Sequence, residues 1–218
     1  MLTPKQTVIP NLVRVKPGAL DRMGIYAERS GFGRVLLFFS HGLDVSLLKR
    51  LTGSLRSSGV EILQQTEVSS VSFEKATELF RQSPANAEVV IGFGGGKALD
   101  VAKYIAFLLR LPYLSVPTSL SNDGFCSPQS SLTVEDRRRS MASAMPFGVI
   151  LDTAVCLNAP EILWHSGVGD LVSKNLRQSR IGRWPSMRWE LTLTILPPCF
   201  RIPVFISSWP DPSVAQRV

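Results

Sequence analysis

Short apolar runs alternate with longer amphipathic runs from Arg34 onward, a pattern that builds parallel strands joined by helical crossovers. The apolar runs predict strands at residues 34–39, 61–66, 89–93 and 113–116. The amphipathic runs between them predict helices at residues 45–57, 73–82 and 98–109. Together these elements predict an α/β fold built on a parallel sheet.

The pattern changes after residue 130. Residues 131–141 carry two acids and three arginines between apolar flanks, which is typical of an exposed hairpin whose charges lie in solvent. Residues 148–151 predict a further strand, and the pattern then becomes helical, with Pro160 suited to a first helical turn. We therefore assign residues 1–152 to the α/β domain and expect a second, helical domain to begin near Thr153.

Length and composition fit a globular protein. With 218 residues, 44% of them hydrophobic, the chain can hold one domain plus part of a second. Its three cysteines are too irregularly spaced for a disulfide framework or a CxxC metal site. The first ten residues do not resemble a secretion signal, and Arg110 and Pro112 interrupt the most apolar segment. We expect a cytoplasmic protein with no membrane span.

The positive charge is concentrated near the C-terminus. A net charge of +7 can attract phosphate-rich partners such as nucleic acid. However, the last 44 residues hold six arginines against two acids, so the first 174 residues are only mildly basic. We expect no nucleic-acid partner, and keep as an alternative a nucleic-acid-binding protein that uses the arginines and tryptophans of this tail.

A glycine cluster follows the predicted strand at residues 89–93. The chain reads VVIGFGGGKALDVAK over residues 89–103, an apolar run that leads through glycines into a helix. Glycines let the backbone approach a diphosphate, and the free N–H groups of a helix start supply donors and a favourable dipole. The motif is neither the dinucleotide GxGxxG nor the P-loop, since no Ser or Thr follows Lys97. Taken alone, such a cluster is as often a tight turn as a phosphate site.

A polar loop follows the predicted strand at residues 113–116. It reads SVPTSLSNDGFCSP over residues 115–128, with several hydroxyl groups and the carboxylate of Asp123. Ligands of an open parallel sheet bind beyond the carboxyl ends of the strands, where this loop and the glycine cluster would meet. An ordinary polar turn is the alternative.

A third segment, SGVGDLVSK over residues 166–174, places Asp170 after a glycine at the start of a predicted helix. An aspartate there can cap the helix. It can also ligate a divalent metal if histidines arrive from elsewhere in the fold. From this segment alone, capping is the favoured interpretation.

In this order and spacing, GGGKALDVAK, SVPTSLSNDGFCSP and SGVGDLVSK resemble the glycerol-1-phosphate dehydrogenase family over about the first four-fifths of the chain. That family belongs to a wider group with dehydroquinate synthases, glycerol dehydrogenases and iron-containing alcohol dehydrogenases. The resemblance implies a Rossmann-like nucleotide-binding domain followed by an all-α metal-binding domain. It also implies a homo-oligomeric NAD(P)-dependent oxidoreductase that interconverts sn-glycerol 1-phosphate, a phosphorylated polyol, and dihydroxyacetone phosphate.

The resemblance further implies roles for individual residues. Two sets would contact NAD or NADP: at the pyrophosphate Gly94, Gly95, Gly96, Lys97 and Asp100, and elsewhere on the cofactor Thr118, Ser119, Ser121 and Ser127. Asp123 would act on the substrate, and Asp170 would both touch the substrate and ligate a catalytic metal, expected to be zinc, with iron or nickel as alternatives. The metal would polarise the substrate alcohol so that its carbon can release hydride to nicotinamide C4.

The chain departs from the family at two positions. Family members commonly carry an acid after the first strand of the nucleotide-binding fold, whereas this chain has His41 there, which leaves the choice between NAD and NADP open. Asn122 stands where relatives often have histidine. A glycerol dehydrogenase, an iron-type alcohol dehydrogenase or a dehydroquinate-synthase-like enzyme therefore stays an alternative. His41 and His165 by themselves are typical of surface histidines rather than ligands.

The chain changes character after Lys174. Six prolines and three of the four tryptophans lie beyond it, at a density that would break the long helices implied by the resemblance. Suitable synonymous codons for residues 174–194, read one base out of phase, spell KSAAVADWKMAFHAVGTHFND, which is amphipathic and family-like. We hypothesise that a frameshift near Asn175 made residues 175–218 a non-native tail and left the helical domain of residues 153–218 incomplete.

The expected consequence is loss of the metal. His41 and His165 are the only histidines of the chain, so both histidine ligands implied by the resemblance would be missing. We predict little or no dehydrogenase activity for this chain, although a protein with the complete helical domain should have it. A nucleotide-binding remnant without catalysis is the remaining alternative.

Overall fold

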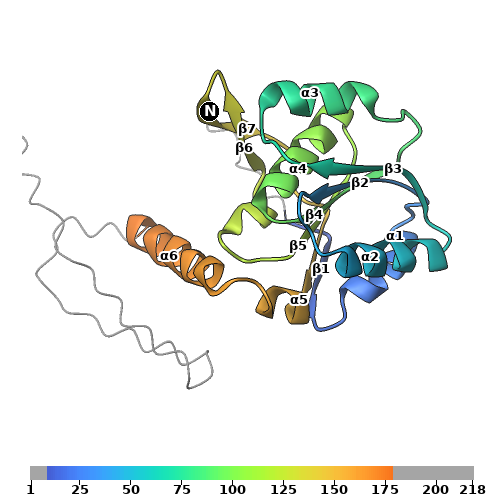
Figure 1. Ribbon diagram of the computed structural model, residues 1–218, viewed down its shortest axis with the longest axis horizontal. Coiled ribbons are helices and arrows are strands. Elements are labelled where there is room, and N and C mark those ends of the chain that lie inside the picture. Colours follow the sequence, from blue (N-terminus) through green and yellow to red (C-terminus); the bar gives the residue numbers. More distant parts are fainter. Residues whose placement is uncertain (1–8, 179–218) are drawn as a thin grey trace, which may run out of the picture. The chain divides into compact units, whose positions relative to one another are not determined.

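The computed structural model describes residues 9–178, of which residues 9–177 lie in one compact unit. Its centre is a six-stranded, fully parallel sheet in the order β1-β8-β5-β4-β2-β3 (Figure 1). The strands are β1 (Leu12–Lys16), β2 (Arg34–Ser40), β3 (Glu61–Val68), β4 (Val89–Gly94), β5 (Tyr113–Pro117) and β8 (Gly148–Asp152). A separate antiparallel hairpin consists of β6 (Gln129–Val134) and β7 (Arg137–Ala142).

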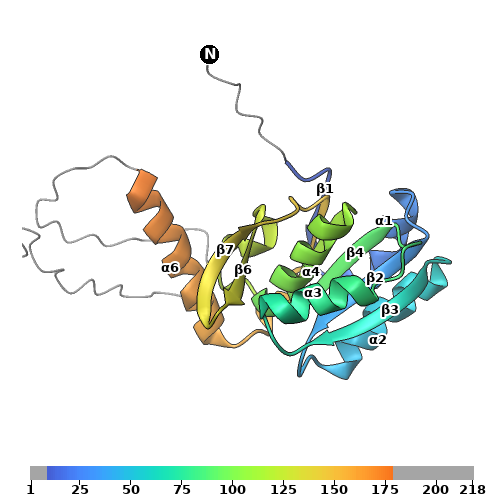
Figure 2. The same ribbon diagram turned by 90° about the horizontal axis from the view of Figure 1, so that it is seen from above.

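Helices cover both faces of the sheet (Figure 2). One face carries the short 3-10 helix η1 (Leu20–Arg22) with α1 (Met23–Arg29) and α2 (Val45–Ser57), and the other carries α3 (Phe73–Gln82) and α4 (Gly96–Leu109). Because successive strand side chains point to opposite faces, Val35 and Leu37 pack towards α2 while Leu36 and Phe38 pack towards α4. The sheet therefore has an apolar core on each side, as a three-layer α/β fold requires.

Local sequence explains where α2 and α3 begin. The side chain of Asp44 accepts a hydrogen bond from the Ser46 N–H at 2.8 Å, and that of Ser72 accepts one from the Lys75 N–H at 3.2 Å. Each cap satisfies a backbone donor that has no partner inside its helix. The helices predicted at residues 45–57 and 73–82 are confirmed with the same bounds.

The predicted hairpin is also confirmed. Its two-residue turn, Glu135–Asp136, has positive φ angles of 48° and 59°, as in the type I′ turn that fits the twist of paired strands. The elements β1 and α1 were not predicted. β1 is an edge strand with Val13 and Val15 exposed, and β8, with which it pairs in the described sheet, lies far along the sequence.

The neighbouring strands β2 and β4 send their connections to opposite faces of the sheet. The helix after β2 is α2, on the first face, whereas the helix after β4 is α4, on the second. Such a reversal between adjacent parallel strands opens a crevice at their carboxyl ends, which is where ligands of open α/β sheets bind.

Two helices follow the last strand. The first is α5 (Thr153–Leu157), and α6 (Glu161–Gln178) begins directly after Pro160. Asp170 lies in the middle of α6, so the prediction that it opens and caps a helix was wrong. No described helix has the length and apolar character of a membrane span. All but the first four residues of the hypothesised frameshifted tail lie outside the described residues.

Candidate functional site

The glycine cluster lies at the carboxyl edge of the sheet, between the ends of β2, β4 and β5. Gly94 has φ of 130°, and a Cβ on it would collide with the side chain of Ser40. The Gly95 N–H donates to the Ser40 Oγ at 2.9 Å, and the Thr118 N–H donates to the Gly94 carbonyl at 3.0 Å. These contacts fix the turn between the three strand ends.

The first turn of α4 faces open space. Gly95 caps the helix without a side-chain hydrogen bond, and a Cβ on Gly96 would meet no atom within 4 Å. The first N–H groups of an α-helix have no acceptor within the helix and carry the positive end of its dipole. Lys97 beside them is exposed. The geometry therefore suits a diphosphate, which could approach the backbone closely.

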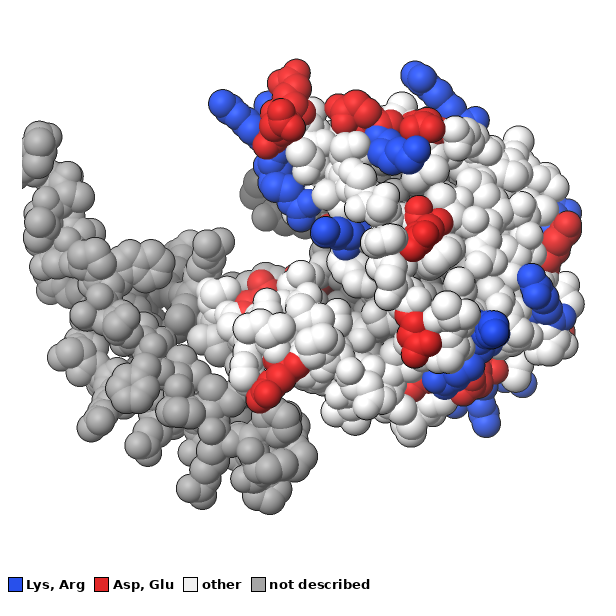
Figure 3. Space-filling model, in the orientation of Figure 1, with Lys and Arg blue, Asp and Glu red and all other residues white. Residues whose placement is uncertain are grey.

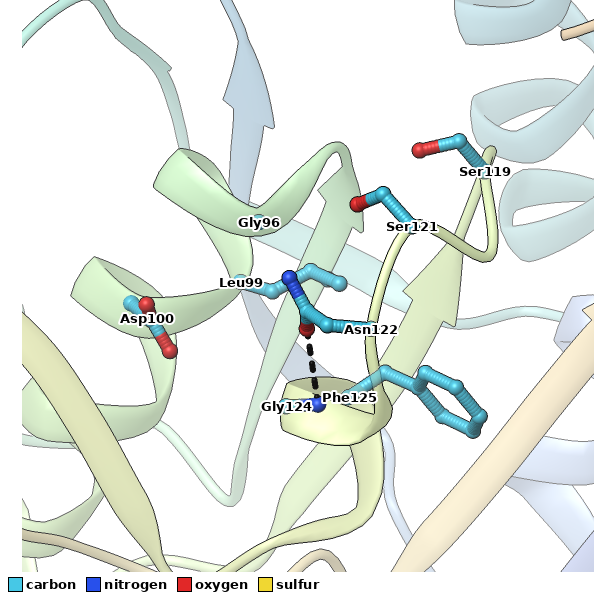
Figure 4. Close-up of a pocket in the computed structure, with 8 residues that line it drawn as sticks. All are labelled: Gly96, Leu99, Asp100, Ser119, Ser121, Asn122, Gly124 and Phe125. Carbon is cyan, nitrogen blue, oxygen red and sulfur yellow. Dashed lines mark hydrogen bonds between the residues drawn. The ribbon is translucent and has the colours of Figure 1, made fainter. Parts of the chain in front are cut away.

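The polar loop runs beside this helix start (Figure 4). A small pocket of about 20 Å³ separates the two (Figure 4). It is lined by Gly96, Leu99, Asp100, Ser119, Ser121, Asn122, Gly124 and Phe125. A volume of this size admits about one water molecule, so a dinucleotide would lie across the mouth of the pocket rather than inside it.

Asn122 shapes the wall of this pocket. Its Oδ1 accepts a hydrogen bond from the Gly124 N–H at 2.8 Å, drawn dashed in Figure 4, and so caps the 3-10 helix η2 (Asp123–Cys126). A histidine here would lack the side-chain carbonyl that makes this cap. Asn122 therefore has a structural role in this chain.

Helix α6 packs against the same loop. The side chain of Asp170 accepts the N–H of Asp123 at 3.2 Å, and the Ser166 Oγ donates to the Ser121 carbonyl at 3.0 Å. Gly167 is buried, and a Cβ on it would collide with the carbonyl oxygen of Leu120. The three segments singled out in the sequence thus lie next to one another.

The described residues fit a diphosphate better than a catalytic metal. Asp123 and Asp170 approach each other, but within residues 9–178 no group of three or more His, Cys, Asp or Glu side chains could hold an ion. The Nε2 of His165 lies 3.6 Å from the Oε1 of Glu161, one turn earlier on α6. A catalytic zinc needs three protein ligands, so we derive no chemical step through a metal from these residues.

Comparison with known proteins identifies the family. A profile of the iron-containing alcohol dehydrogenases matches residues 14–160. The chain belongs to the iron-containing alcohol dehydrogenase family. The matched region runs from β1 to the residue before α6.

Several sequence relatives are glycerol-1-phosphate dehydrogenases (NAD(P)+). That of Thermofilum pendens is 35% identical over 167 residues, and that of Metallosphaera sedula is 39% identical over 173 residues. Each match covers 76% of this chain but 48% and 47% of the respective relative. The chain spans about half the length of the curated relatives it matches.

Solved structures show the same fold. Glycerol dehydrogenase from Schizosaccharomyces pombe superposes with a TM-score of 0.68 and 24% identity, over 80% of this chain and 45% of that one. NADH-dependent butanol dehydrogenase A from Thermotoga maritima gives 0.70 and 20%, over 79% and 50%. The α/β fold with a parallel sheet is therefore confirmed as the fold of this family.

Asp100, which lines the pocket and is partly exposed, forms an ion pair with the fully buried Lys103 on one face of α4. The Lys103 Nζ lies 3.4 Å from an oxygen of Asp100 and donates to the carbonyls of Gly124 and Gln129, both at 2.6 Å. Burial raises the pKa of Asp100 and lowers that of Lys103, and each partner opposes the shift of the other. A backbone hydrogen bond from Ser131 also stabilises the Asp100 carboxylate.

His41, at the position after β2 where the sequence resemblance implies an acid, belongs to an exposed pair. The His41 Nδ1 lies 2.8 Å from the carboxylate of Glu67 on the adjacent strand β3. The Gly42 N–H donates to the same carboxylate at 3.3 Å. A carboxylate therefore lies beside the end of β2, although it comes from the neighbouring strand.

Some residues of this site were not singled out from the sequence. Ser40, which holds the glycine turn, and Phe125, which lines the pocket, gave no clear signal in their own segments. Lys103 did give a sequence signal, because it is a charged residue among apolar neighbours in a buried stretch of helix.

Charges of both signs are mixed on the face of the molecule seen in Figure 3. Blue and red side chains alternate over the described residues there, without a continuous basic field. Proteins that bind nucleic acid through their phosphates need such a field. The nucleic-acid alternative rests on arginines and tryptophans that lie, apart from Arg177, beyond residue 178 and so outside the described residues.

Proposed function

We propose that this chain binds NAD or NADP, with the diphosphate on the glycine cluster and the rest of the cofactor along the polar loop. The observation that carries the proposal is the open start of α4, where glycine backbone and the first helix amides, without a side-chain cap, face a crevice between β2 and β4. The cofactor residues proposed are those implied by the resemblance, of which Gly96, Asp100, Ser119 and Ser121 line the pocket.

Glu67 favours NAD over NADP. An acidic group next to a dinucleotide cradle bonds the ribose 2′-hydroxyl, and its charge repels the 2′-phosphate of NADP. Glu67 is half exposed and is held beside the end of β2 by His41 and Gly42. We therefore expect the 218-residue chain to bind NAD+ more tightly than NADP+.

The proposed reaction of a protein with the complete helical domain is the interconversion of sn-glycerol 1-phosphate and dihydroxyacetone phosphate in the cytoplasm, with NAD(P) and a divalent metal. The relatives named above support it, because they are glycerol-1-phosphate dehydrogenases. Asp123 and Asp170, joined by a hydrogen bond beside the pocket, are proposed to face the substrate. A panel of glycerol 1-phosphate, glycerol, simple alcohols and the dehydroquinate-synthase substrate would separate this activity from those of the sister enzymes.

The nucleotide proposal is tested on the 218-residue chain by calorimetric titration with NAD+, NADP+ and ADP. We expect Gly96→Asp to weaken NAD+ and ADP binding at least tenfold, because a carboxylate at the helix start repels the diphosphate. Gly53→Asp is the matched control, since Gly53 is also a helical glycine with open space around it, far from the cradle on α2. Absence of NAD+ and ADP binding to the folded wild-type chain at millimolar concentration would refute the proposal.

A further inference from the structure

Lys103 is the most completely buried charged group of the described residues. Its side chain has no exposed surface, yet it lies on α4 below the pocket rather than in it. Burying a lysine is costly unless its ammonium group is well bonded. Here the three donors of the ammonium match three acceptors: the Asp100 carboxylate and two backbone carbonyls.

The two carbonyls belong to opposite ends of one short segment. Gly124 lies within η2, and Gln129 begins strand β6. The Ser127 Oγ approaches the same two carbonyls, each at 3.4 Å. Lys103 therefore hydrogen-bonds to both ends of the segment 124–129. These bonds connect the segment to α4, the helix that starts at the glycine cluster.

This segment contains or adjoins the groups expected to meet the ligand. Ser127 lies inside it and Asp123 directly precedes it. The Asp123 carbonyl accepts a contact from the Cys126 thiol at 3.4 Å, so the position of Asp123 is coupled to the turn. The Lys103 side chain links this turn to α4, and the neighbouring Asp100 side chain accepts a backbone hydrogen bond from Ser131 in β6.

We propose that Lys103 is a positioning residue that sets the distance between the polar loop and the diphosphate cradle, and so allows one dinucleotide to contact both. This inference rests on the proposed nucleotide function. It assigns to Lys103 no contact with the ligand. It also gives Asp100 a second role, as the counter-charge that keeps Lys103 bonded inside the protein.

The test compares NAD+ with ADP. ADP carries the diphosphate but lacks the nicotinamide riboside, so it needs only the cradle, whereas NAD+ also needs the loop. In Lys103→Met, with its buried donors removed, we expect NAD+ affinity to fall about tenfold while ADP affinity changes less than twofold. Lys103→Arg, which keeps a cation with several donors, should recover part of the loss. Lys75→Met on α3 is the control, because Lys75 is an exposed lysine paired with Glu78.

Circular dichroism and urea unfolding establish which variants are folded. If Lys103→Met does not fold, Lys103→Gln carries the comparison, since its shorter amide can still donate to one carbonyl. If a folded variant keeps the wild-type ratio of NAD+ affinity to ADP affinity, the inference about Lys103 is overturned. The nucleotide proposal would still stand. A wild-type chain that binds neither ligand would instead refute the nucleotide proposal itself.

Discussion

At the scale of single residues, two glycines of the cradle have different physical roles. Gly94 combines a positive φ angle with contact against Ser40, so both its backbone and its missing side chain are required by the fold. Gly96 has an ordinary helical place and open space where a Cβ would go, so nothing in the fold requires glycine there. If Gly96 is needed, a ligand must be the reason.

Substituting these glycines with alanine separates the two roles. We expect Gly94→Ala to lower the free energy of unfolding by roughly 2–4 kcal/mol, because Ser40 must move and the backbone becomes strained. Gly96→Ala should leave stability within about 1 kcal/mol, since alanine favours helix, yet weaken ADP binding by crowding the diphosphate. Urea unfolding and calorimetry measure both quantities. Equal stability of the two variants would contradict the role given to Gly94.

At the scale of elements, the sequence predicts what local physics determines. The helices α2 and α3 have amphipathic patterns and side-chain caps, so their bounds were predicted correctly. The strand β1 was missed because its pattern is that of an exposed edge, and only pairing with β8 makes it a strand. The glycine cluster was found because strand, turn and helix are contiguous. By contrast, the roles of Ser40 and Lys103 depend on contacts with distant segments.

Helix α6 shows how tertiary contact overrides a local pattern. The sequence SGVGD looks like a break before a helix, but α6 runs through it. Gly167 accounts for this in part, because its lack of a side chain lets the helix meet the carbonyl of Leu120. That approach places Asp170 where it accepts the Asp123 N–H.

The two glycines of this motif provide a matched pair. Gly167→Ala should destabilise the chain by about 1–3 kcal/mol, because its Cβ would collide with a backbone atom that cannot rotate away. In Gly169→Ala the added Cβ meets no atom within 4 Å, so the higher helix propensity of alanine should stabilise α6 by up to about 1 kcal/mol. Urea unfolding of both variants is the measurement. A stabilising Gly167→Ala would show that α6 does not pack on the loop as described.

At the scale of the whole molecule, the described residues include the proposed cofactor site but only part of the proposed metal site. The crevice between β2 and β4 is built from residues 34–128, which are contiguous in the matched family region. The proposed metal site has only Asp170 in the described part, next to Asp123. Cofactor binding and metal binding should therefore separate experimentally in this chain, whereas a complete enzyme needs both for hydride transfer.

Zinc binding and NAD+ binding should be separable in the 218-residue chain. Equilibrium dialysis of the 218-residue chain with Zn²⁺ should show no site tighter than about 10 μM, because fewer than three suitable ligands surround Asp170 among the described residues. With NADH, dihydroxyacetone phosphate and added Zn²⁺, the chain should give no turnover while still binding NAD+. A version whose codons are shifted by one base from Lys174, to encode KSAAVADWKMAFHAVGTHFND over residues 174–194, should gain zinc affinity and activity, since this segment contains two histidines. Steady turnover by the 218-residue chain itself, abolished by Asp170→Asn, would show that the metal site is complete without them.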